Sequence, residues 1–300
     1  MTIEHEEPCL LCGNNKYHYV KHGLLKCTVC GIVLDKKVWD KSANIKQQEQ
    51  WFECEQFVES FWVRLFQLLN NRRTWKRIKE YLPSDGKVLE IGVGNGALLC
   101  YMKNKNIDVE GCDLSKAASD HIRQRYSITM HNCSAGEIPS DKKYDAVVMN
   151  HILEHVNEPV GFLADVKAHL KKDGIAHIVV PNIGSWEAKL SGWVGYEPYH
   201  LSYFMPETLV RTTGKAGLKM IHTSTHESFS GWFLAILRTL LKISPQTGKG
   251  SHPQQKAKFV TWKEHIYRMA MVISGVVLLP LRYVQGKLGY GDEVVIICRA

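Results

Sequence analysis

The residues whose types and spacing indicate the most definite chemistry are four cysteines near the N-terminus. Cys9 and Cys12 form one CxxC pair, Cys27 and Cys30 form a second, and fourteen residues separate the two pairs. Four thiolates at this spacing are typical of a tetrahedral zinc site. Because four cysteines fill the coordination shell, we predict a structural rather than a catalytic Zn²⁺ ion. The ion would supply the folding energy of a small zinc ribbon spanning residues 1–38.

The cellular compartment bears on how the cysteines are interpreted. The first residues are polar and acidic, and no apolar stretch follows them, so no signal peptide is predicted and we expect a cytoplasmic protein. In a reducing compartment, closely spaced cysteine pairs favour metal binding over disulfides. The other cysteines fit no ligand spacing and are expected in or near the core: Cys54, Cys100, Cys112, Cys133 and Cys298.

A second pattern with chemical meaning is a glycine-rich turn in VLEIGVGNG, residues 88–96. Gly92, Gly94 and Gly96 stand where an apolar strand would run into a helix, and glycines there permit a tight turn and the close approach of a ligand. Asp113 ends the next apolar run, where a carboxylate can accept both hydroxyls of a ribose. Gly92, Gly94 and Ala97 also fit the GxGxxA form of a dinucleotide-binding fingerprint.

Glu90 helps to distinguish a dinucleotide ligand from a nucleoside ligand without a pyrophosphate. It lies inside the strand, two residues before the first glycine. A negative charge at this point is a poor neighbour for a pyrophosphate, whereas it suits a ligand that carries an amino group and a sulfonium.

The elements that would position these residues alternate between short apolar runs and amphipathic stretches. Strands are expected at residues 87–91, 109–112, 127–131, 144–149, 175–180, 218–225 and 293–299, and helices at 96–105, 115–126, 159–171 and 206–216. Strands and helices in alternation predict βαβ units. We therefore predict an α/β fold, Rossmann-like and doubly wound, with a mostly parallel seven-stranded sheet.

Taken together, these segments resemble class I S-adenosylmethionine-dependent methyltransferases, most closely the subgroup similar to ubiquinone-biosynthesis and sugar methyltransferases. The matching pieces are VLEIGVGNG (88–96), EGCDLS (110–115), YDAVVMNHILEHVNEP (144–159), LKKDG (170–174) before VVPN (179–182), and HLSYFMPETL (200–209). The resemblance covers roughly residues 87–226 and the last strand. It implies S-adenosylmethionine as the cofactor.

The resemblance also implies roles for single residues. Gly92, Gly94 and Gly96 would line the methionine part of the cofactor. Glu90 would hold this loop, or bind the amino group through water, and Asp113 would bind the ribose.

Two further cofactor contacts are expected at later strand ends. Ser134 stands where the family often has an aspartate that contacts the adenine, so this position departs from the family pattern. Asn150, at the end of the fourth strand, would face the methyl end of the cofactor.

Three histidines near strand ends are candidates for a catalytic base. Methyl transfer from a sulfonium is an in-line displacement, in which the enzyme aligns the reactants and can remove a proton from the acceptor. His200 is the preferred base and His151 the second, with a packing or hydrogen-bonding role as the alternative for His200. His155 is expected to be structural. Relatives that bind a divalent metal here carry an acid where this chain has His151, so no catalytic metal is expected.

Three aromatic residues near His200 would face the acceptor pocket. They are Tyr199, Tyr203 and Phe204.

The remaining regions flank the methyltransferase domain, which is expected over residues 83–228 and 292–300. Apolar residues at helical spacing predict a helical linker or cap over residues 44–82. Residues 229–291 form an apolar, basic insertion before the last strand, for which we predict helices.

The net charge of +8 is concentrated in residues 228–291, which contain nine lysines or arginines and one acid, Glu264. Residues 269–281 are uncharged but shorter than the ~20 residues that span a bilayer. Apolar helices flanked by cations suit an anionic membrane surface. We therefore predict a peripheral protein at the inner face of the membrane; packing on the sheet or a dimer interface is the alternative.

The predicted function is O-methylation of a sugar, glycolipid or other membrane-proximal acceptor. An RNA methyltransferase is an alternative, because a zinc ribbon and a basic stretch suit nucleic acid. Against it, residues 150–153 lack the Asn/Asp-Pro-Pro-aromatic loop that methylates base amines, and the basic segment interleaves aliphatic residues rather than stacking aromatics. A non-catalytic cofactor-binding scaffold is a third reading, opposed by the intact glycine turn and Asp113. The acceptor and the oligomeric state stay open.

Overall fold

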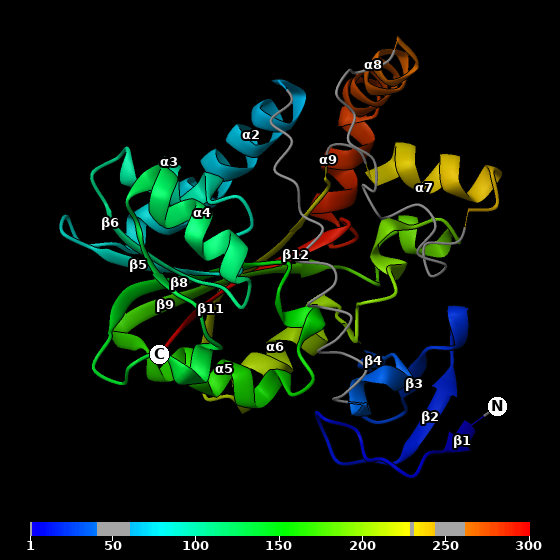
Figure 1. The fold of residues 1–300 in the computed structure, drawn as a ribbon. Coiled ribbons are helices and arrows are strands. Elements are labelled where there is room, and N and C mark those ends of the chain that lie inside the picture. The colour runs from blue at the N-terminus through cyan, green and yellow to red at the C-terminus, as the bar shows by residue number, and fades with distance from the viewer. Residues whose placement is uncertain (1, 41–60, 229–230, 244–261) are drawn as a thin grey trace. The chain divides into compact units, whose positions relative to one another are not determined.

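The computed structural model describes residues 2–40, 61–228, 231–243 and 262–300 (Figure 1). The chain divides into two compact units, each with its own hydrophobic core. The first unit comprises Met1–Asn44, Val180–Leu209 and Thr223–Val295, and the second comprises Ile45–Val179, Val210–His222 and Ile296–Ala300.

A seven-stranded sheet has the order β11-β12-β9-β8-β5-β6-β7. Its strands are β5 (Lys87–Ile91), β6 (Asp108–Cys112), β7 (Thr129–His131), β8 (Tyr144–Asn150), β9 (Leu170–Pro181), β11 (Lys219–His226) and β12 (Glu293–Arg299). The neighbouring strands from β7 through β9 pair in parallel. The predicted Rossmann-like α/β fold with a mostly parallel sheet is therefore confirmed.

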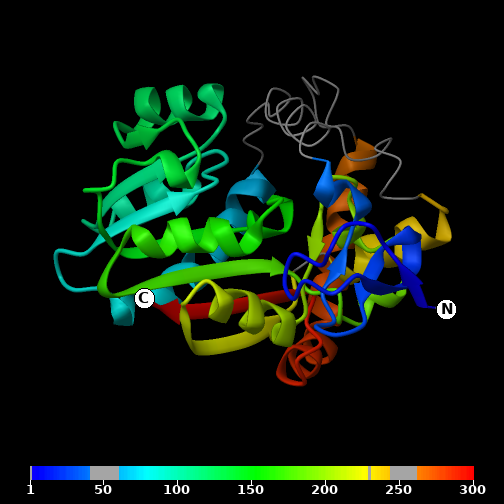
Figure 2. The same cartoon turned by 90° about the horizontal axis from the view of Figure 1, so that it is seen from below.

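Helices cover both faces of this sheet. They are α2 (Phe61–Ile78), α3 (Ala97–Lys103), α4 (Lys116–Tyr126), α5 (Pro159–Ala168) and α6 (Pro206–Lys215). The helices α2, α3 and α4 lie on one face, and α5 and α6 on the other, which is the face seen in Figure 2. Because both faces are covered, Val88, Leu89 and Ile91 of β5 are all buried, as is usual for central parallel strands.

Strand β9 begins earlier than the apolar pattern predicted. The backbone N–H of Tyr144 donates to the carbonyl of His169, and Leu170 pairs with Tyr144. The register then shifts between Tyr144 and Ala146. This early pairing ends α5 at Ala168, although amphipathic spacing predicted a helix to residue 171.

The first unit contains a five-stranded sheet of order β1-β2-β3-β4-β10. Its strands are β1 (Thr2–Glu4), β2 (Lys16–Tyr19), β3 (Leu25–Cys27), β4 (Val33–Leu34) and β10 (Ser202–Tyr203). Four of these strands belong to the cysteine-rich region, whereas β10 comes from far along the chain. No strand was predicted at Ser202–Tyr203.

The insertion before the last strand contains helices, as α7 (Gly231–Leu240), α8 (Trp262–Val277) and α9 (Leu279–Lys287) (Figure 1). Short 3-10 helices span Lys21–Gly23, Lys36–Trp39, Lys79–Tyr81, Ala135–Glu137, Leu153–His155, Glu187–Lys189 and Val194–Tyr196. Of the helical linker predicted at 44–82, residues 44–60 lie outside the described residues. The domain boundaries drawn from the sequence stay a prediction.

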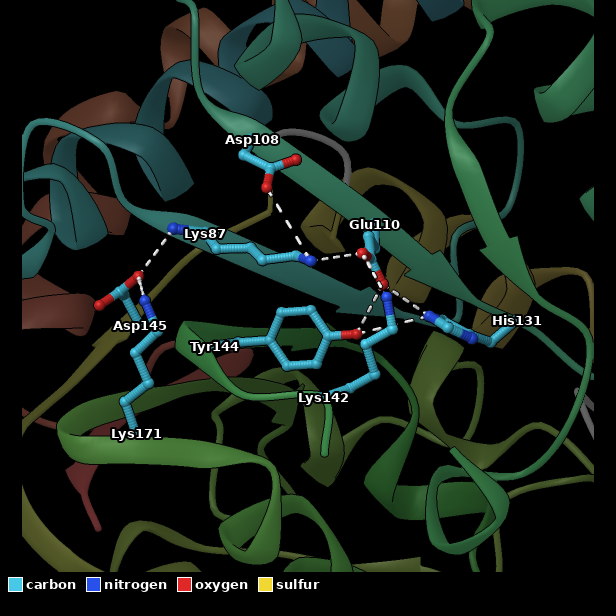
Figure 3. Close-up of polar contacts among 8 residues, drawn as sticks. All are labelled: Lys87, Asp108, Glu110, His131, Lys142, Tyr144, Asp145 and Lys171. Carbon is cyan, nitrogen blue, oxygen red and sulfur yellow. Dashed lines mark hydrogen bonds and ion pairs between the residues drawn. The ribbon is translucent and has the colours of Figure 1, made fainter. Parts of the chain in front are cut away.

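Glu110 on β6 is the centre of a polar network near the amino ends of the strands (Figure 3). Its Oε1 lies 2.5 Å from Lys87 Nζ and 3.4 Å from Lys142 Nζ. Its Oε2 lies 2.7 Å from His131 Nε2 and accepts from the hydroxyl of Tyr144 at 2.8 Å. Burial alone would raise the pKa of Glu110, but the donors from Lys87, His131 and Tyr144 outweigh burial and lower this pKa to about 2.

Asp145 continues the network to the next strands (Figure 3). Its Oδ2 accepts the backbone N–H of Lys87 at 2.8 Å and lies 2.7 Å from Lys171 Nζ. Asp108 lies at the exposed edge, 3.9 Å from Lys87 Nζ. Charged groups on β5, β6, β8 and β9 therefore fix these strands against one another.

Replacing Glu110 with Gln should lower the free energy of unfolding by about 2–3 kcal/mol at pH 7, because the buried carboxylate is lost and the half-buried ammonium of Lys87 loses its nearest anion. The folded-state pKa is depressed, so the stabilisation is complete above the unfolded pKa of about 4.3 and is lost as the pH falls toward 2. Urea unfolding should thus show the difference between the two proteins roughly halved at pH 3.

The matched control is Asp108→Asn, which removes an exposed partner of the same lysine. It should change stability by less than about 1 kcal/mol. Equal losses for Glu110→Gln at pH 7 and pH 3 would show that the carboxylate charge is not responsible.

Candidate cofactor and metal sites

The loop after β5 is built from three glycines in the left-handed region. The φ angles are +74° at Gly92, +49° at Gly94 and +75° at Gly96. A Cβ on Gly92 would lie 1.9 Å from Cδ1 of Ile152, and one on Gly96 would lie 2.8 Å from Cγ1 of Ile122. A Cβ on Gly94 would meet nothing within 4 Å. Packing thus requires the first and third glycines, while the middle one borders open space.

Asp113 follows β6 and holds this loop. Its Oδ2 accepts the N–H of Val93 at 2.9 Å, and its Oδ1 accepts the N–H of Ser115 at 2.8 Å. Burial raises the pKa of Asp113, and the N–H groups of Ser115, Val93 and Gly94 oppose that rise. Each carboxylate oxygen can accept more than one hydrogen bond, so capacity for a ligand hydroxyl remains.

Glu90 on β5 is a buried acid with unused hydrogen-bonding capacity. Its Oε2 has no hydrogen-bond partner, although the backbone N–H of Leu99 donates to the carboxyl group. Burial, followed by the charge of Asp113, raises the pKa of Glu90 well above its ordinary value. An unpaired buried oxygen is unfavourable, so this position suits a ligand that brings hydrogen-bond donors or positive charge.

Asn150 and His151 stand at the carboxyl end of β8. The Oδ1 of Asn150 is buried without a partner. His151 has a φ of +57°, and its N–H donates to the carbonyl of Val179 at 2.8 Å, while its side chain is exposed. Strand order reverses at β5, with β6 on one side and β8 on the other. In such sheets, ligands bind outside the carboxyl ends of the strands at this reversal.

Ser134 follows β7 and caps the 3-10 helix Ala135–Glu137. Its hydroxyl donates to Oε2 of Glu137 at 2.7 Å, and the same oxygen accepts the N–H of Ser134 at 2.8 Å. The side chain is exposed. Its predicted adenine contact stays a prediction, and its observed role is to cap the helix.

Glu154 was not singled out from the sequence. It is buried, with Oε1 lying 3.4 Å from His151 Nδ1 and 4.0 Å from His155 Nε2. Burial lowers the pKa of His155, and the charge of Glu154 partly opposes this. The signal in the sequence was an acid placed between two histidines in an otherwise apolar run.

His200 belongs to the first unit, whereas the other predicted cofactor-binding and catalytic residues belong to the second. Its ring is buried, and Nδ1 lies 2.8 Å from the carbonyl of Gly195. A carbonyl only accepts, so Nδ1 carries the proton and Nε2 retains a lone pair in the neutral ring. The rings of Tyr199 and Tyr203 lie 5.3 and 6.1 Å from that of His200.

The four N-terminal cysteines converge in the first unit. Their sulfur atoms all lie within 4.8 Å of one another, with 3.5 Å between Cys9 and Cys30 and 3.4 Å between Cys12 and Cys27. Tetrahedral Zn²⁺ with Zn–S bonds of about 2.3 Å requires sulfurs about 3.8 Å apart. The donor set therefore fits a zinc ion.

Cys27 is the acidic member of the four-cysteine cluster, whereas hydrogen bonds from neighbouring sulfurs and burial raise the pKa of Cys30, and burial raises that of Cys12. Burial raises the pKa of this thiol, but N–H groups of Cys30 and Val29, with the side chains of Cys12 and Asn14, lower it to about 6. Thiolate is the metal-binding form of cysteine.

The methyltransferase domain family matches residues 62–223, more than half of the chain. The chain belongs to this family. The resemblance to class I S-adenosylmethionine-dependent methyltransferases is thus confirmed.

Two curated relatives of this chain are ubiquinone biosynthesis O-methyltransferases. That of Pelagibacter ubique is 26% identical over 48% of this chain and 59% of its own length. That of Idiomarina loihiensis is 28% identical over 45% of this chain and 62% of its own length. The matched part is therefore less than two thirds of either relative.

A solved S-adenosylmethionine-dependent methyltransferase from Archaeoglobus fulgidus shares the fold. Its TM-score is 0.51 at 19% identity, over 78% of this chain and 94% of that one. The methyl donor of this family carries an amino group, a sulfonium and a ribose. The unpaired oxygen of Glu90, the open side of Gly94 and the carboxylate of Asp113 offer matching chemistry for these groups.

In this chain, Gly94→Ala should weaken binding of S-adenosylhomocysteine by more than about tenfold, because the new methyl group would occupy the open space beside the loop. The left-handed backbone should cost about 1–2 kcal/mol of stability. Calorimetric titration measures the affinity and urea unfolding the stability.

Gly289→Ala is the matched control, with a φ of +84° and nothing within 4 Å of the added Cβ. It carries the same backbone penalty at a position outside the loop, so the affinity should not change. If Gly94→Ala and Gly289→Ala bind S-adenosylhomocysteine equally well, Gly94 does not contact the cofactor.

Proposed function

We propose that this protein transfers the methyl group of S-adenosylmethionine to an oxygen atom of a sugar, glycolipid or other acceptor near a membrane surface. The observation that carries the proposal is the unpaired, buried oxygen of Glu90 beside a glycine loop held by Asp113. The two ubiquinone biosynthesis O-methyltransferases named above favour oxygen as the methylated atom.

The cofactor supplies an electrophilic methyl group, so the protein has to bind, orient and deprotonate. The proposed binding residues are Glu90, the three loop glycines, Asp113, Ser134 and Asn150. His200 is the proposed base, because it is a buried histidine whose ring is oriented by the hydrogen bond between Nδ1 and the carbonyl of Gly195. His151 is the second candidate.

Incubation of the enzyme and trideuteromethyl-labelled cofactor with lipid and glycan extracts should add one labelled methyl group to an acceptor, detected by mass spectrometry. With that acceptor, His200→Ala should lower kcat about 100- to 1,000-fold, since a positioned base contributes on this scale. His200→Asn restores a donor toward Gly195 without a basic nitrogen, so it should fold like the wild type and be equally slow. Binding of S-adenosylhomocysteine should be unchanged in both variants.

Full activity of His200→Asn would show that the ring only positions its loop. Labelled RNA in place of a labelled lipid or glycan would support the RNA methyltransferase alternative. Cofactor binding without methyl transfer to any acceptor would support the non-catalytic scaffold alternative, and absence of cofactor binding would contradict the proposed function.

The proposed membrane contact is the outer face of α7, α8 and α9. Most large hydrophobic side chains exposed in the described part of the chain lie between Ile236 and Tyr290. The most exposed are Leu240 at 74%, Leu241 at 59%, Ile273 at 56%, Val277 at 68%, Tyr283 at 68% and Leu288 at 58%. Exposed apolar side chains in this number on three helices of one insertion favour an interaction site there.

The charge of this surface favours an anionic bilayer as the partner. Lys242 and Lys287 are exposed at the ends of α7 and α9. Among the described residues, no single helix is long and apolar enough to cross a bilayer; Met269–Val277 and Leu279–Lys287 reach the composition only as a pair bent by 58°. Helices with exposed apolar faces and flanking cations suit the interface of a membrane. We therefore propose a peripheral location.

Leu240→Asp should lower the partition constant on phosphatidylglycerol-containing vesicles at least about tenfold, because an exposed leucine that inserts contributes on the order of 2 kcal/mol. Sedimentation with vesicles measures it, and added salt should weaken binding further. Leu68→Asp, 41% exposed on α2, is the control and should bind normally. Sedimentation with neutral and anionic vesicles alike would argue against the cationic contribution.

A further inference from the structure

The cysteine-rich sheet of the first unit is completed by the chain segment that carries His200. Ser202 and Tyr203 of β10 pair antiparallel with Leu34 and Val33 of β4. The N–H of Asp35 extends this pairing by donating to the carbonyl of Leu201 at 2.8 Å. His200 therefore lies directly before a strand that depends on the cysteine-rich region for its partner.

The two regions also share one hydrophobic core. Leu24 and Val33 from the cysteine-rich region pack in one cluster with Trp193, Tyr196 and Tyr203. These side chains are all nearly inaccessible to solvent. Each region buries apolar side chains against the other, so their packing is coupled.

Further contacts join the 182–204 segment to the same region. The ring of His22 lies 4.3 Å from that of Tyr196. Lys37 Nζ donates to the carbonyl of Pro198 at 3.1 Å, and Lys21 Nζ donates to the carbonyl of Lys189.

The proposed zinc site lies at the turn that forms β4. Cys27 ends β3, and Cys30 stands three residues before Val33, the first residue of β4. The N–H of Cys27 donates to the carbonyl of Ile32 at 2.9 Å, and the N–H of Gly31 donates to the carbonyl of Cys27 at 3.1 Å. A metal ion held by both cysteines would therefore close the β3–β4 hairpin. Two short strands are marginal without such support.

We propose that Zn²⁺ binding at the four cysteines orders the 182–204 segment, so that the zinc ribbon acts as a positioning element for His200. The ion fixes β3 and β4, β4 supplies the edge for β10, and the shared core holds Trp193 and Tyr196. This proposal rests on the proposed zinc ion but not on the identity of the methyl acceptor.

Hydrogen–deuterium exchange of the full chain, with zinc bound and after chelation, tests the coupling. Removal of zinc should raise exchange at least about tenfold in peptides covering residues 194–204, as well as in residues 2–39. Peptides covering residues 88–113 should be unchanged, and so should the affinity for S-adenosylhomocysteine. Zinc content is measured on the same samples.

A variant that keeps all four cysteines provides the reciprocal test. Tyr196→Ala loosens the shared core from the side of the 182–204 segment. Because coupling between two sites is reciprocal, the affinity for Zn²⁺, measured by competition with a chelator, should fall at least about tenfold. Tyr283→Ala, which removes an exposed tyrosine of α9, is the control and should bind zinc like the wild type.

Each outcome supports or overturns the proposal. If the zinc-free chain exchanges faster only in residues 2–39, the ribbon does not position His200. An unchanged zinc affinity in Tyr196→Ala leads to the same conclusion. If the purified chain contains no zinc and binds none, the proposed zinc site is wrong. The proposed methyltransferase function would not be affected by this result.

Discussion

The carboxylate of Asp113 holds the loop on which the proposed cofactor site depends. Three left-handed glycines give the loop a shape that residues with a Cβ adopt only at a steric cost, and fixing these glycines costs conformational entropy. The carboxylate of Asp113 accepts the N–H of Val93, which lies in the loop, and the N–H of Ser115, which lies in the turn after β6. The end of β6 thus fixes the turn that leaves β5. A site ordered before its ligand arrives loses less entropy when it binds.

Two buried acids on adjacent strands have different roles: one stabilises the sheet, and the other belongs to the proposed cofactor site. Glu110 is surrounded by donors near the amino ends of the strands, and its pKa falls to about 2. Glu90, on β5, has an unpaired oxygen and a raised pKa. Glu110, whose oxygens all have partners, fixes the register of the strands. Glu90 has one oxygen without a partner, and this oxygen can accept a hydrogen bond from a ligand. The difference arises from their partners, because both side chains are buried.

The sequence predicted those features that depend on local pattern. The bounds of β5 follow from an apolar run that ends at a glycine, and the cysteine pairs follow from a fixed ligand spacing. Strand β10 could not be predicted, because two residues carry no periodicity and their partner lies in a distant part of the chain. The packing of Ile152 against Gly92 could not be predicted for the same reason, because the two residues are far apart in sequence. Burial of Glu154 is likewise a tertiary property, since an acid in sequence is normally assigned to the surface.

Contacts between residues far apart in sequence also position the insertion that contains α7, α8 and α9. Gln285 of α9 is fully buried, donates to Glu187 at 2.6 Å and accepts from Nε1 of Trp232 on α7 at 2.9 Å. Asn182 donates to the carbonyl of Gly291 at 2.7 Å. Buried polar groups are stable only when their partners are in place, so these bonds fix α9 against the 182–204 segment. That segment is thus held from two directions, by the cysteine-rich sheet and by the helices with the exposed apolar face. Neither attachment involves the β5–β8 core that forms the proposed cofactor site, so the order of this segment and the order of the cofactor loop depend on different contacts.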